Sequence, residues 1–515
     1  MNSTDTNLTY LSVLLTGVII GANYQRIISF LRPTTTTPTT TTTTSAPTLK
    51  QTTLRQRLKH FCNAQSISYQ NTEPLMALQT SMQYVIDDQG TKFLDSRNNV
   101  GHVGWQHPQV VRAIQEQTAL CNANSRYLHP KRGMLAEKLL SHFPAELCVV
   151  FFVNSGSEAN DLALRLARTH TTHHDAIVVD RAYHGHSNAT LALSPYKYEH
   201  TGGEMYRAEW VYKVACPDMY RGEFSQLQPT QAAIEYAKEI KQACQESNTA
   251  GKKIAAFFIE SGMSVAGVIL PPPTYLKECY AHVRKAGGVC IADEVQTGFG
   301  RFGSSYWGFQ QQNVVPDIVT IGKPFGNGFP LAAVVCSQKI ADSFTNGLEY
   351  FNTFGGNPVA CAAGLAVLNV IESEKLQQHA LVVGKHFKQR LKEMGAQSMG
   401  AHPGGEGGGG VKVEVEEEGM FIGDVRGCGL FIGIEFVRNR TTKEPATAET
   451  SILCSRLKSI SNILTSIDGR YNNVIVIKPP MCFTVEDADR LMDAMVAIVP
   501  TITKGDVATF VHTPT

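Results

Sequence analysis

The sequence predicts an α/β protein whose larger domain contains a mostly parallel sheet. Between about residues 85 and 345, short apolar runs alternate with amphipathic stretches of helical periodicity. Runs such as "KIAAFFIE" (253–260) and "GVCIADEV" (288–295) are continuously apolar, which is typical of strands buried on both faces. Such strands, separated by helices, predict a parallel sheet that helices cover. A chain of 515 residues is long enough for about two or more domains.

The N-terminal segment 1–32 is a possible signal anchor or targeting segment. It contains the uncharged apolar run "LTYLSVLLTGVIIGA" (8–22), which Arg26 and Arg32 follow. A membrane span needs about 20 residues, so this run is short unless it continues to residue 24. A signal anchor, a cleaved targeting segment and a helix packed elsewhere all stay open. An anchor would leave the enzyme body in the cytosol, because the arginines follow the apolar run; the other expected location is the mitochondrion.

The remaining chain divides by composition. Residues 33–50 are rich in Thr and Pro and predict an extended linker. We expect 51–115 to form the N-terminal part of a smaller α+β domain, 116–355 the large domain, and 356–515 the C-terminal part of the small domain. The long run after residue 355, "NPVACAAGLAVLNVIESEKL", predicts one helix. The glycine run 401–410 predicts a flexible surface insertion, because no strand leads directly into it.

Charge and cysteine content exclude some classes of function. The net charge of +1 provides no basic field for nucleic acid. The 12 cysteines are scattered without a CxxC pair, which indicates free thiols in a reducing compartment.

Two motifs resemble common binding sites without meeting their requirements. "GFGRFG" (298–303) matches the dinucleotide-binding G-x-G-x-x-G, but "SSYWGF" after it is a poor helix start. The histidines of "HTTHH" (170–174) and "HGH" (184–186) have no nearby acidic or cysteine set. We therefore predict neither a dinucleotide site nor a metal site.

One strand leads into a turn suited to an anion, at "FVNSGSEAND" (152–161). The free N–H groups of the first helical turn and the helix dipole attract negative charge there. Gly156 lets the backbone come close to a phosphate. Ser155 can also cap the helix while Glu158 completes a capping box, and the two interpretations are compatible.

Two other strands end in charged residues. "IADEVQTGFGR" (291–301) places Asp293 and Glu294 at the carboxyl end of a buried strand, where open α/β sheets bind ligands. The next strand, "DIVTIG", ends at Lys323. A carboxylate or a lysine buried at such a place is paired or functional.

Together, an anion cradle, a carboxylate and a lysine are the groups that pyridoxal 5'-phosphate requires. The helix N-terminus binds the phosphate, the carboxylate keeps the pyridine nitrogen protonated, and the lysine forms a Schiff base. Tyr183, in "AYHGH" after another strand, could stack on the ring.

These residues resemble the class III aminotransferases, which have the PLP-dependent transferase fold type I. The resemblance spans residues 70–500 and rests on "NSGSEAN", "AYHGH", "IADEVQTGFGR", "GKPFGNGFP", "FNTFGGNPVACAAGLAVL" and "DVRGCGLFIGIEF". It implies that the cofactor-binding residues are Gly156, Ser157, Tyr183, Asp293, Gln296, Lys323 and Thr353. In this set Asp293 pairs with the pyridinium, Gln296 approaches the ring hydroxyl, and Lys323 carries the cofactor.

The resemblance also implies an assembly. Thr353, in "NTFGGNP", resembles the residue that reaches the phosphate in a neighbouring subunit. We therefore expect a homodimer or a dimer of dimers.

Within the family, two branches are similar to this sequence. One contains the phospho-lyases for ethanolamine phosphate and 5-phosphohydroxylysine, and the other contains the mitochondrial alanine–glyoxylate aminotransferases. "PDMYRGEF", "NSRYLHP", "EPATAET" and "VIVIKPPMCFTVEDAD" are more similar to the phospho-lyases. The expected substrate is therefore a phosphorylated amine, with an amino acid as the alternative.

The anion-binding positions favour the same branch. Aminotransferases for α-amino acids need a cation, best an arginine, for the carboxylate. Val476 stands where many family members carry that arginine, and Val265 where glutamate-using members carry the acid that gates it. Candidate contacts for a substrate phosphate are Lys478, Arg126 and Arg301. A catalytically inactive scaffold is a third possibility, against which the intact Lys323 and Asp293 argue.

Overall fold

The computed structural model describes residues 47–70, 72–396 and 419–510. The apolar run at 8–24 and the glycine run at 401–410 lie outside these residues. No helix among the described residues has both the length and the apolar character needed to cross a membrane. The chain forms two compact units, Met1–Asn63 and Ala64–Thr515.

In the first unit, the structure describes helix α2 (Leu49–His60). The Thr48 side chain accepts a hydrogen bond from Gln51 N, and the Gln51 side chain accepts one from Thr48 N. This reciprocal capping box begins the helix at Leu49. Leu49 and Lys50, the last residues of the predicted linker, are therefore helical.

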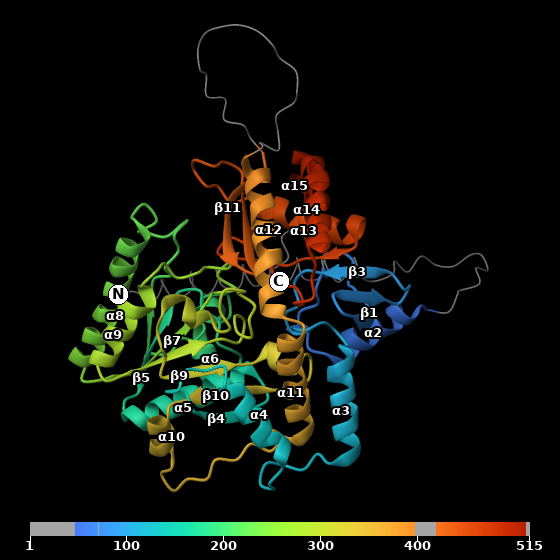
Figure 1. Ribbon diagram of the computed structural model, residues 1–515. Coiled ribbons are helices and arrows are strands. Elements are labelled where there is room, and N and C mark those ends of the chain that lie inside the picture. The colour runs from blue at the N-terminus through green and yellow to red at the C-terminus, as the bar shows by residue number, and fades with distance from the viewer. Residues whose placement is uncertain (1–46, 71, 397–418, 511–515) are drawn as a thin grey trace, which may run out of the picture. The chain divides into compact units, whose positions relative to one another are not determined.

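The second unit is built on a seven-stranded sheet (Figure 1). In spatial order its strands are β4 (Val149–Val153), β10 (Ala332–Cys336), β9 (Ile318–Ile321), β8 (Val289–Asp293), β7 (Ile254–Glu260), β5 (Asp175–Val179) and β6 (Val211–Val214). Strand β10 is antiparallel to both of its neighbours, and every other adjacent pair is parallel. This confirms the predicted α/β class with a mostly parallel sheet.

Both faces of this sheet are buried, which explains the continuous apolar runs. The covering helices include α5 (Gly156–Thr171), α8 (Pro229–Thr249), α9 (Tyr275–Lys285) and α10 (Gln338–Phe344). On β5, Ile177 and Val179 pack with α8 and α9, whereas Ala176 and Val178 pack with α5. Side chains alternate between the faces of a strand, so a strand covered on both sides must be apolar at every position.

Two smaller sheets complete the second unit. One has the order β1 (Ala77–Ser81), β2 (Tyr84–Asp87), β3 (Lys92–Asp95) and β13 (Ile463–Leu464); the other has β11 (Phe421–Cys428), β12 (Phe431–Val437), β15 (Val474–Ile477) and β14 (Ile467–Asp468). Strand β13 runs parallel to β3 and so joins two distant segments. These are the segments that the sequence assigns to the small domain, whose boundaries stay a prediction.

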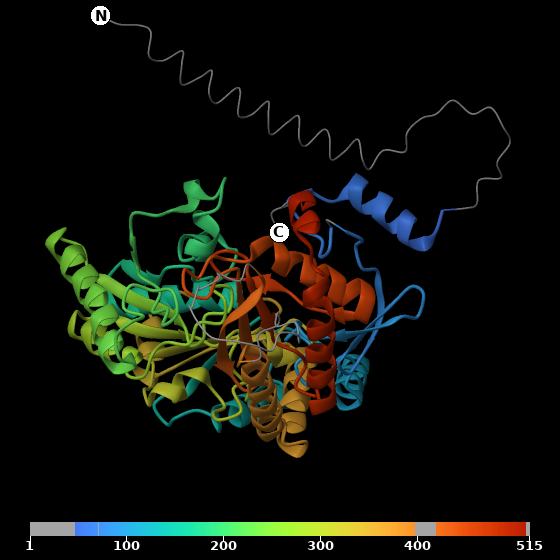
Figure 2. The ribbon, with the colours of Figure 1, turned by 90° about the horizontal axis from the view of Figure 1, so that it is seen from above.

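The C-terminal half adds several helices to this unit (Figure 2). They are α11 (Pro358–Ser373), α12 (Leu376–Ala396), α13 (Thr447–Ser461), α14 (Val485–Ile498) and α15 (Lys504–Thr509). Helix α11 packs against α3 (Pro108–Leu120) and α4 (Pro130–Leu140), while α12 packs against α14 and β11. The helix predicted over residues 357–376 is α11, which ends at Ser373, and Lys375 adopts a positive φ of 51° between α11 and α12.

The sheet direction brings the predicted site residues to one edge. Strands β5, β7, β8 and β9 are parallel, and β4 has the same direction because β10 is antiparallel to both β4 and β9. The carboxyl ends of all five strands therefore lie at the same edge. In open α/β sheets this edge is where ligands bind.

Candidate active site

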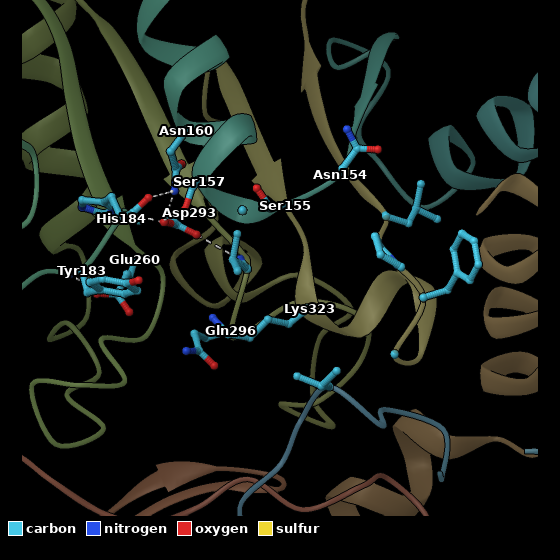
Figure 3. A pocket seen from close by; sticks show the side chains of 18 residues that line it. Asn154, Ser155, Ser157, Asn160, Tyr183, His184, Glu260, Asp293, Gln296 and Lys323 are labelled. Atoms are coloured by element: carbon cyan, nitrogen blue, oxygen red, sulfur yellow. Dashed lines mark hydrogen bonds and ion pairs between the residues drawn. The ribbon is translucent and has the colours of Figure 1, made fainter. Parts of the chain in front are cut away.

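A pocket of about 360 Å³ lies at this edge of the sheet (Figure 3). Six of the seven predicted cofactor-binding residues line it: Gly156, Ser157, Tyr183, Asp293, Gln296 and Lys323. They come from the start of α5, the segment after β5, the end of β8 and the start of the short 3-10 helix η3 (Lys323–Gly326). The seventh, Thr353, is exposed and lies outside the pocket.

The start of α5 forms the anion end of the pocket. Ser155 caps the helix, since its side chain accepts a hydrogen bond of 3.2 Å from Glu158 N. The Glu158 carboxylate does not complete the expected capping box, because it accepts from Asn154 N at 2.8 Å. Helix geometry leaves the N–H groups of Gly156 and Ser157 without acceptors in the helix. These groups are available to an anion.

Glycine at position 156 is needed for packing. A Cβ atom there would lie 3.0 Å from Val295 Cγ1. Gly322, before Lys323, approaches this turn closely, since a Cβ there would lie 3.3 Å from Gly156 N. The lysine strand and the anion cradle are thus packed backbone to backbone.

Asp293 is held rigidly at the end of β8. It is 3% exposed. Its Oδ2 accepts hydrogen bonds of 2.8 Å from both Asn160 Nδ2 and His184 Nδ1, and its Oδ1 accepts from Val295 N at 3.0 Å. Thr320 Oγ1 in turn donates to Asn160 Oδ1 at 2.7 Å. Hydrogen bonds of this kind compensate a buried carboxylate and fix its direction.

Lys323 follows β9 and is half-buried at the wall of the pocket. Burial lowers the pKa of its amine, while the negative charges of Asp293 and Glu260 act in the opposite direction. A lysine with a lowered pKa is more often neutral, which is the form that attacks an aldehyde or accepts a proton.

Tyr183 and Gln296 occupy the sides of the pocket. Tyr183 N donates to Glu260 Oε1 at 3.1 Å. Burial, Asp293 and Glu260 raise the pKa of the Tyr183 phenol, so the phenol stays neutral. Gln296 Oε1 accepts a hydrogen bond of 2.7 Å from Asn99 Nδ2. That bond leaves the Gln296 amide N–H groups available to a ligand.

The three predicted phosphate contacts have very different surroundings. Arg126 is exposed, ion-paired with Glu349 at 3.0 Å, and outside the pocket. Arg301 is fully buried: Nη1 donates to Leu430 O and Pro479 O at 3.1 and 2.7 Å, and Nη2 contacts His102 Nδ1 at 3.1 Å. Arg301 therefore connects three segments of the chain. Its Nη1 and Nη2 atoms are engaged in these contacts, which favours a structural role for Arg301 over a substrate contact.

Lys478 remains as a candidate. It is 7% exposed, and its ammonium donates to Ser264 Oγ at 2.7 Å. Ser264 N donates to Glu260 Oε2 at 3.2 Å, and Glu260 lines the pocket. The positive charge of Lys323 helps to lower the pKa of Lys478, so the two amines interact electrostatically.

Arg97 and Lys197 act electrostatically on the same carboxylate as Lys478, and we name Arg97, Lys197 and Lys478 the cationic group. Lys197 Nζ lies 5.9 Å from the ring centroid of Tyr183, which lines the pocket. Asp468 on β14 interacts electrostatically with all three cations. The cationic group thus adjoins the pocket through Tyr183 and through the contacts of Ser264.

Val476 and Val265 stand where many family members carry the carboxylate-binding arginine and the acid that gates it, and both positions are apolar in this chain. Val476 is fully buried and packs with Val268, Phe302, Phe431 and Val474. Val265 is half-buried. A cation that replaced Val476 in this apolar cluster would be costly without a partner.

Sequence reasoning missed Asn160, His184, Glu260 and the partners of Lys478. Glu260 ends a buried strand, so the rule that identified Asp293 could have found it. Asn160 and His184 stand in "NSGSEAN" and "AYHGH", but only the fold turns them toward Asp293. The sequence carries no signal that Arg97, Lys197 and Asp468 would meet.

The residues of the pocket fit pyridoxal phosphate. The N–H groups at the start of α5 suit its phosphate. The buried Asp293 carboxylate suits a protonated ring nitrogen, and the amine of Lys323 suits its aldehyde. His184 binds Asp293 through Nδ1. The other nitrogen of its imidazole ring, Nε2, is buried without a hydrogen-bond partner in the described part of the chain.

Comparisons with known proteins agree with this chemistry. The aminotransferase class-III family model matches residues 67–403. A Drosophila melanogaster protein named alanine–glyoxylate aminotransferase 2-like is 45% identical over 446 residues, covering 86% of each chain. A Caenorhabditis elegans protein named ethanolamine-phosphate phospho-lyase homolog 1 is 40% identical over 425 residues, covering 81% of this chain and 86% of its own.

A solved structure gives the same result. It is a phospholyase from Arthrobacter in complex with phosphoethanolamine, which superimposes with a TM-score of 0.77 at 33% identity. The alignment covers 89% of this chain and 100% of that one. This chain belongs to the class III aminotransferase family and is a pyridoxal-phosphate-dependent enzyme of that family.

Proposed function

We propose that this enzyme is a phospho-lyase that converts O-phosphoethanolamine, or a related phosphorylated amine, to an aldehyde, ammonia and phosphate. Water is the second reactant. The observation that carries the proposal is the buried ammonium of Lys478, which donates to Ser264 Oγ at 2.7 Å and interacts electrostatically with Lys323. A substrate whose amine reaches Lys323 can therefore place an anionic group near Lys478.

The charges at this end favour a phosphate over an α-carboxylate. Arg97, Lys197 and Lys478 together supply several N–H donors, and a phosphate ester offers three strong acceptor oxygens with a charge of about −2. The position at which many aminotransferases of the family carry the carboxylate-binding arginine is the buried Val476. The similarity to a phospholyase in complex with phosphoethanolamine supports the same substrate class.

In the proposed mechanism, the cofactor supplies an electron sink that stabilises negative charge on the amine-bearing carbon. The N–H groups of Gly156 and Ser157 hold its phosphate. Asp293 keeps its ring nitrogen protonated, and Tyr183 stacks on the ring. The placement of these residues around one pocket supports these proposed roles.

Lys323 then acts as the general base. Its lowered pKa suits an amine that is released in neutral form and accepts the proton from the amine-bearing carbon. The bond between the neighbouring carbon and the phosphate oxygen breaks, and the electron pair of that bond leaves with the phosphate. Lys478 stabilises the charge that develops on the leaving oxygen.

We further propose that the active unit is a homodimer. Thr353 is exposed outside its own pocket, and the nearby Leu348 and Phe354 are 65% and 68% exposed. Large apolar side chains on a surface often mark a contact with another subunit. In a dimer, Thr353 would reach the cofactor phosphate of the partner.

The second candidate function is amino transfer to an oxo acid such as glyoxylate. The 45% identity with a protein named alanine–glyoxylate aminotransferase 2-like favours it. In that reaction, the substrate anion is a carboxylate, which carries one charge and needs no cluster of three cations.

One assay separates the two functions. Holoenzyme is given phosphoethanolamine without any oxo acid, and free phosphate and acetaldehyde are measured. We expect equal amounts of both products. Amino transfer from alanine to glyoxylate without any phosphate release would contradict the phospho-lyase proposal and establish the second candidate.

A further inference from the structure

Asp468 is the carboxylate that faces the cationic group. It lies on β14, which pairs with β15, and is half-buried. The next residue, Gly469, donates from its N–H to Val265 O at 3.0 Å, and Val265 follows Ser264, the hydrogen-bond partner of Lys478 Nζ. Within the described residues its carboxylate forms neither a hydrogen bond nor an ion pair, although Arg97, Lys197 and Lys478 all act on it electrostatically. Most buried carboxylates next to cations form direct pairs, and Arg426 shows this nearby with Asp424 at 2.8 Å.

Because Asp468 forms no direct pair with the cations, their N–H donors stay available to a ligand. Lys478 has three N–H donors and uses one on Ser264 Oγ. Lys197 Nζ lies over the rings of Tyr183 and Tyr196, at 5.9 and 5.0 Å from their centroids. An ion pair with Asp468 would occupy donors that a phosphate needs. Asp468 instead supplies negative charge from a distance.

We propose that Asp468 determines specificity for phosphate by setting the net charge of the cationic group without binding any of its members directly. This inference rests on the proposed phospho-lyase function. Three cations and one carboxylate leave a net charge of +2 in this cluster, which matches the charge of about −2 on a phosphate ester near neutral pH. The cluster would match a carboxylate, with its single charge, less well.

The charges around Lys478 explain why it needs this support. Burial and the positive charges of Lys323, Arg97 and Arg301 together lower the pKa of Lys478 to about 8, against the opposing effect of Asp468. Burial likewise raises the pKa of Asp468 to about 6, and Lys478, Arg97 and Lys197 oppose that rise. Between about pH 6 and 8, both groups are therefore charged.

The sign of the pH dependence follows directly. Lys478 is protonated below a pKa of about 8 and neutral above it, so phosphate binding weakens as the pH rises past that value. Removing the Asp468 charge lowers the pKa of Lys478, so the loss of binding begins at a lower pH. A variant that merely perturbs the fold would not move this transition.

The test uses ethyl phosphate, which carries the phosphate of the substrate and lacks its amine. Isothermal titration calorimetry on the holoenzyme, whose cofactor site is already filled, gives Kd from pH 7 to 9. For the wild type, we expect Kd to rise above about pH 8, by up to about tenfold per pH unit. For Asp468→Asn, we expect the rise in Kd to begin at least half a pH unit lower. This shift corresponds to about threefold weaker binding at pH 8.

Three variants serve as controls. Asp468→Glu keeps the charge and should retain the wild-type profile. Lys478→Arg should remove the transition, because arginine stays protonated, and it tests the same point if Asp468→Asn does not fold. Asp493→Asn changes an exposed carboxylate that is paired with Arg390 and should match the wild type. Cofactor absorbance and thermal midpoints check that each variant is folded.

Two outcomes would overturn the inference. One is an unchanged pH profile in Asp468→Asn, and the other is equal or tighter binding of ethyl phosphate by that variant from pH 7 to 9. The phosphate-release assay separates this failure from failure of the proposed function. A wild type that binds ethyl phosphate with the expected profile but releases no phosphate would contradict the chemistry and leave the role of Asp468 intact.

Discussion

The cofactor pocket and the adjoining cationic group hold their carboxylates in opposite ways. At the cofactor end, Asp293 accepts three hydrogen bonds of 2.8 to 3.0 Å, from Asn160, His184 and Val295 N. At the adjoining end, which we propose binds the substrate, Asp468 interacts electrostatically with three cations and, among the described residues, is hydrogen-bonded to none of them. The first carboxylate is fixed by direct contacts, and the second acts through its charge.

The difference reflects what each end must do. The cofactor end always binds the same molecule. Rigid groups with satisfied hydrogen bonds therefore do not restrict its function, and they keep the reacting groups correctly positioned. The substrate end must bind and release an anion in every cycle, which requires unoccupied donors. We therefore expect changes at the cofactor end to lower turnover with every substrate, and changes at the substrate end to affect phosphorylated amines selectively.

The largest expected effect is that of Lys323→Ala. Loss of the amine removes the covalent attachment and the general base together, so kcat should fall by at least about 10³-fold with any amine. The variant should still bind pyridoxal phosphate through the start of α5, which ultrafiltration and absorbance would show. The exposed Lys241→Ala should behave as wild type. Near-normal turnover of Lys323→Ala would contradict the proposed mechanism.

Asp293→Asn should have the next largest effect. The amide keeps the shape and removes the negative charge that would protonate the ring nitrogen. We expect kcat to fall by about 10²-fold or more for phosphorylated and unphosphorylated amines alike. A fall confined to phosphorylated amines would show that Asp293 acts on the substrate end, and the distinction between the two ends would fail.

Lys478→Gln should separate the two ends most clearly. Losing one charged hydrogen bond costs about 1.5 to 3 kcal/mol, which corresponds to roughly 10- to 10²-fold in KM for phosphoethanolamine. Turnover of an amine without phosphate should change little. Steady-state kinetics with both substrates make the test, and equal losses for the two substrates would remove Lys478 from phosphate recognition.

Arg301→Leu should change stability more than substrate choice. It deprives Leu430 O and Pro479 O of their donor and removes the contact with His102 Nδ1. Buried groups left without partners cost about 1 to 3 kcal/mol each, so the thermal midpoint should fall by several degrees. Arg112→Leu, on the exposed face of α3, is the control and should leave the midpoint unchanged.

Local sequence patterns predicted the cofactor end well. Gly156, Asp293 and Lys323 lie at strand ends or in the turns that follow them, so an apolar run followed by a glycine or a charged residue indicates each of them. The family resemblance supplied Ser157, Gln296 and Thr353. Six of the seven predicted residues line one pocket. Thr353 does not, and its role as a residue that serves the partner subunit stays a proposal.

The same reasoning failed for the phosphate contacts. Arg126, Arg301 and Lys478 are all cations within motifs that resemble the family, and the sequence does not rank them. The structure shows Arg126 ion-paired at the surface and Arg301 bound to backbone carbonyls. A motif indicates which residues are close in sequence, but the direction of a long side chain depends on what packs around it.

The sequence alone determined the α/β class, the parallel sheet and the lysine, carboxylate and anion cradle at its edge, because these depend on periodicities within single segments. Only the tertiary structure decided which charges meet at the substrate end. Arg97 and Lys197 lie far in the sequence from Asp468 and Lys478, and these segments are connected by pairings such as β13 with β3 and β14 with β15. Electrostatic interactions depend on distance in space, which no single segment of the sequence specifies.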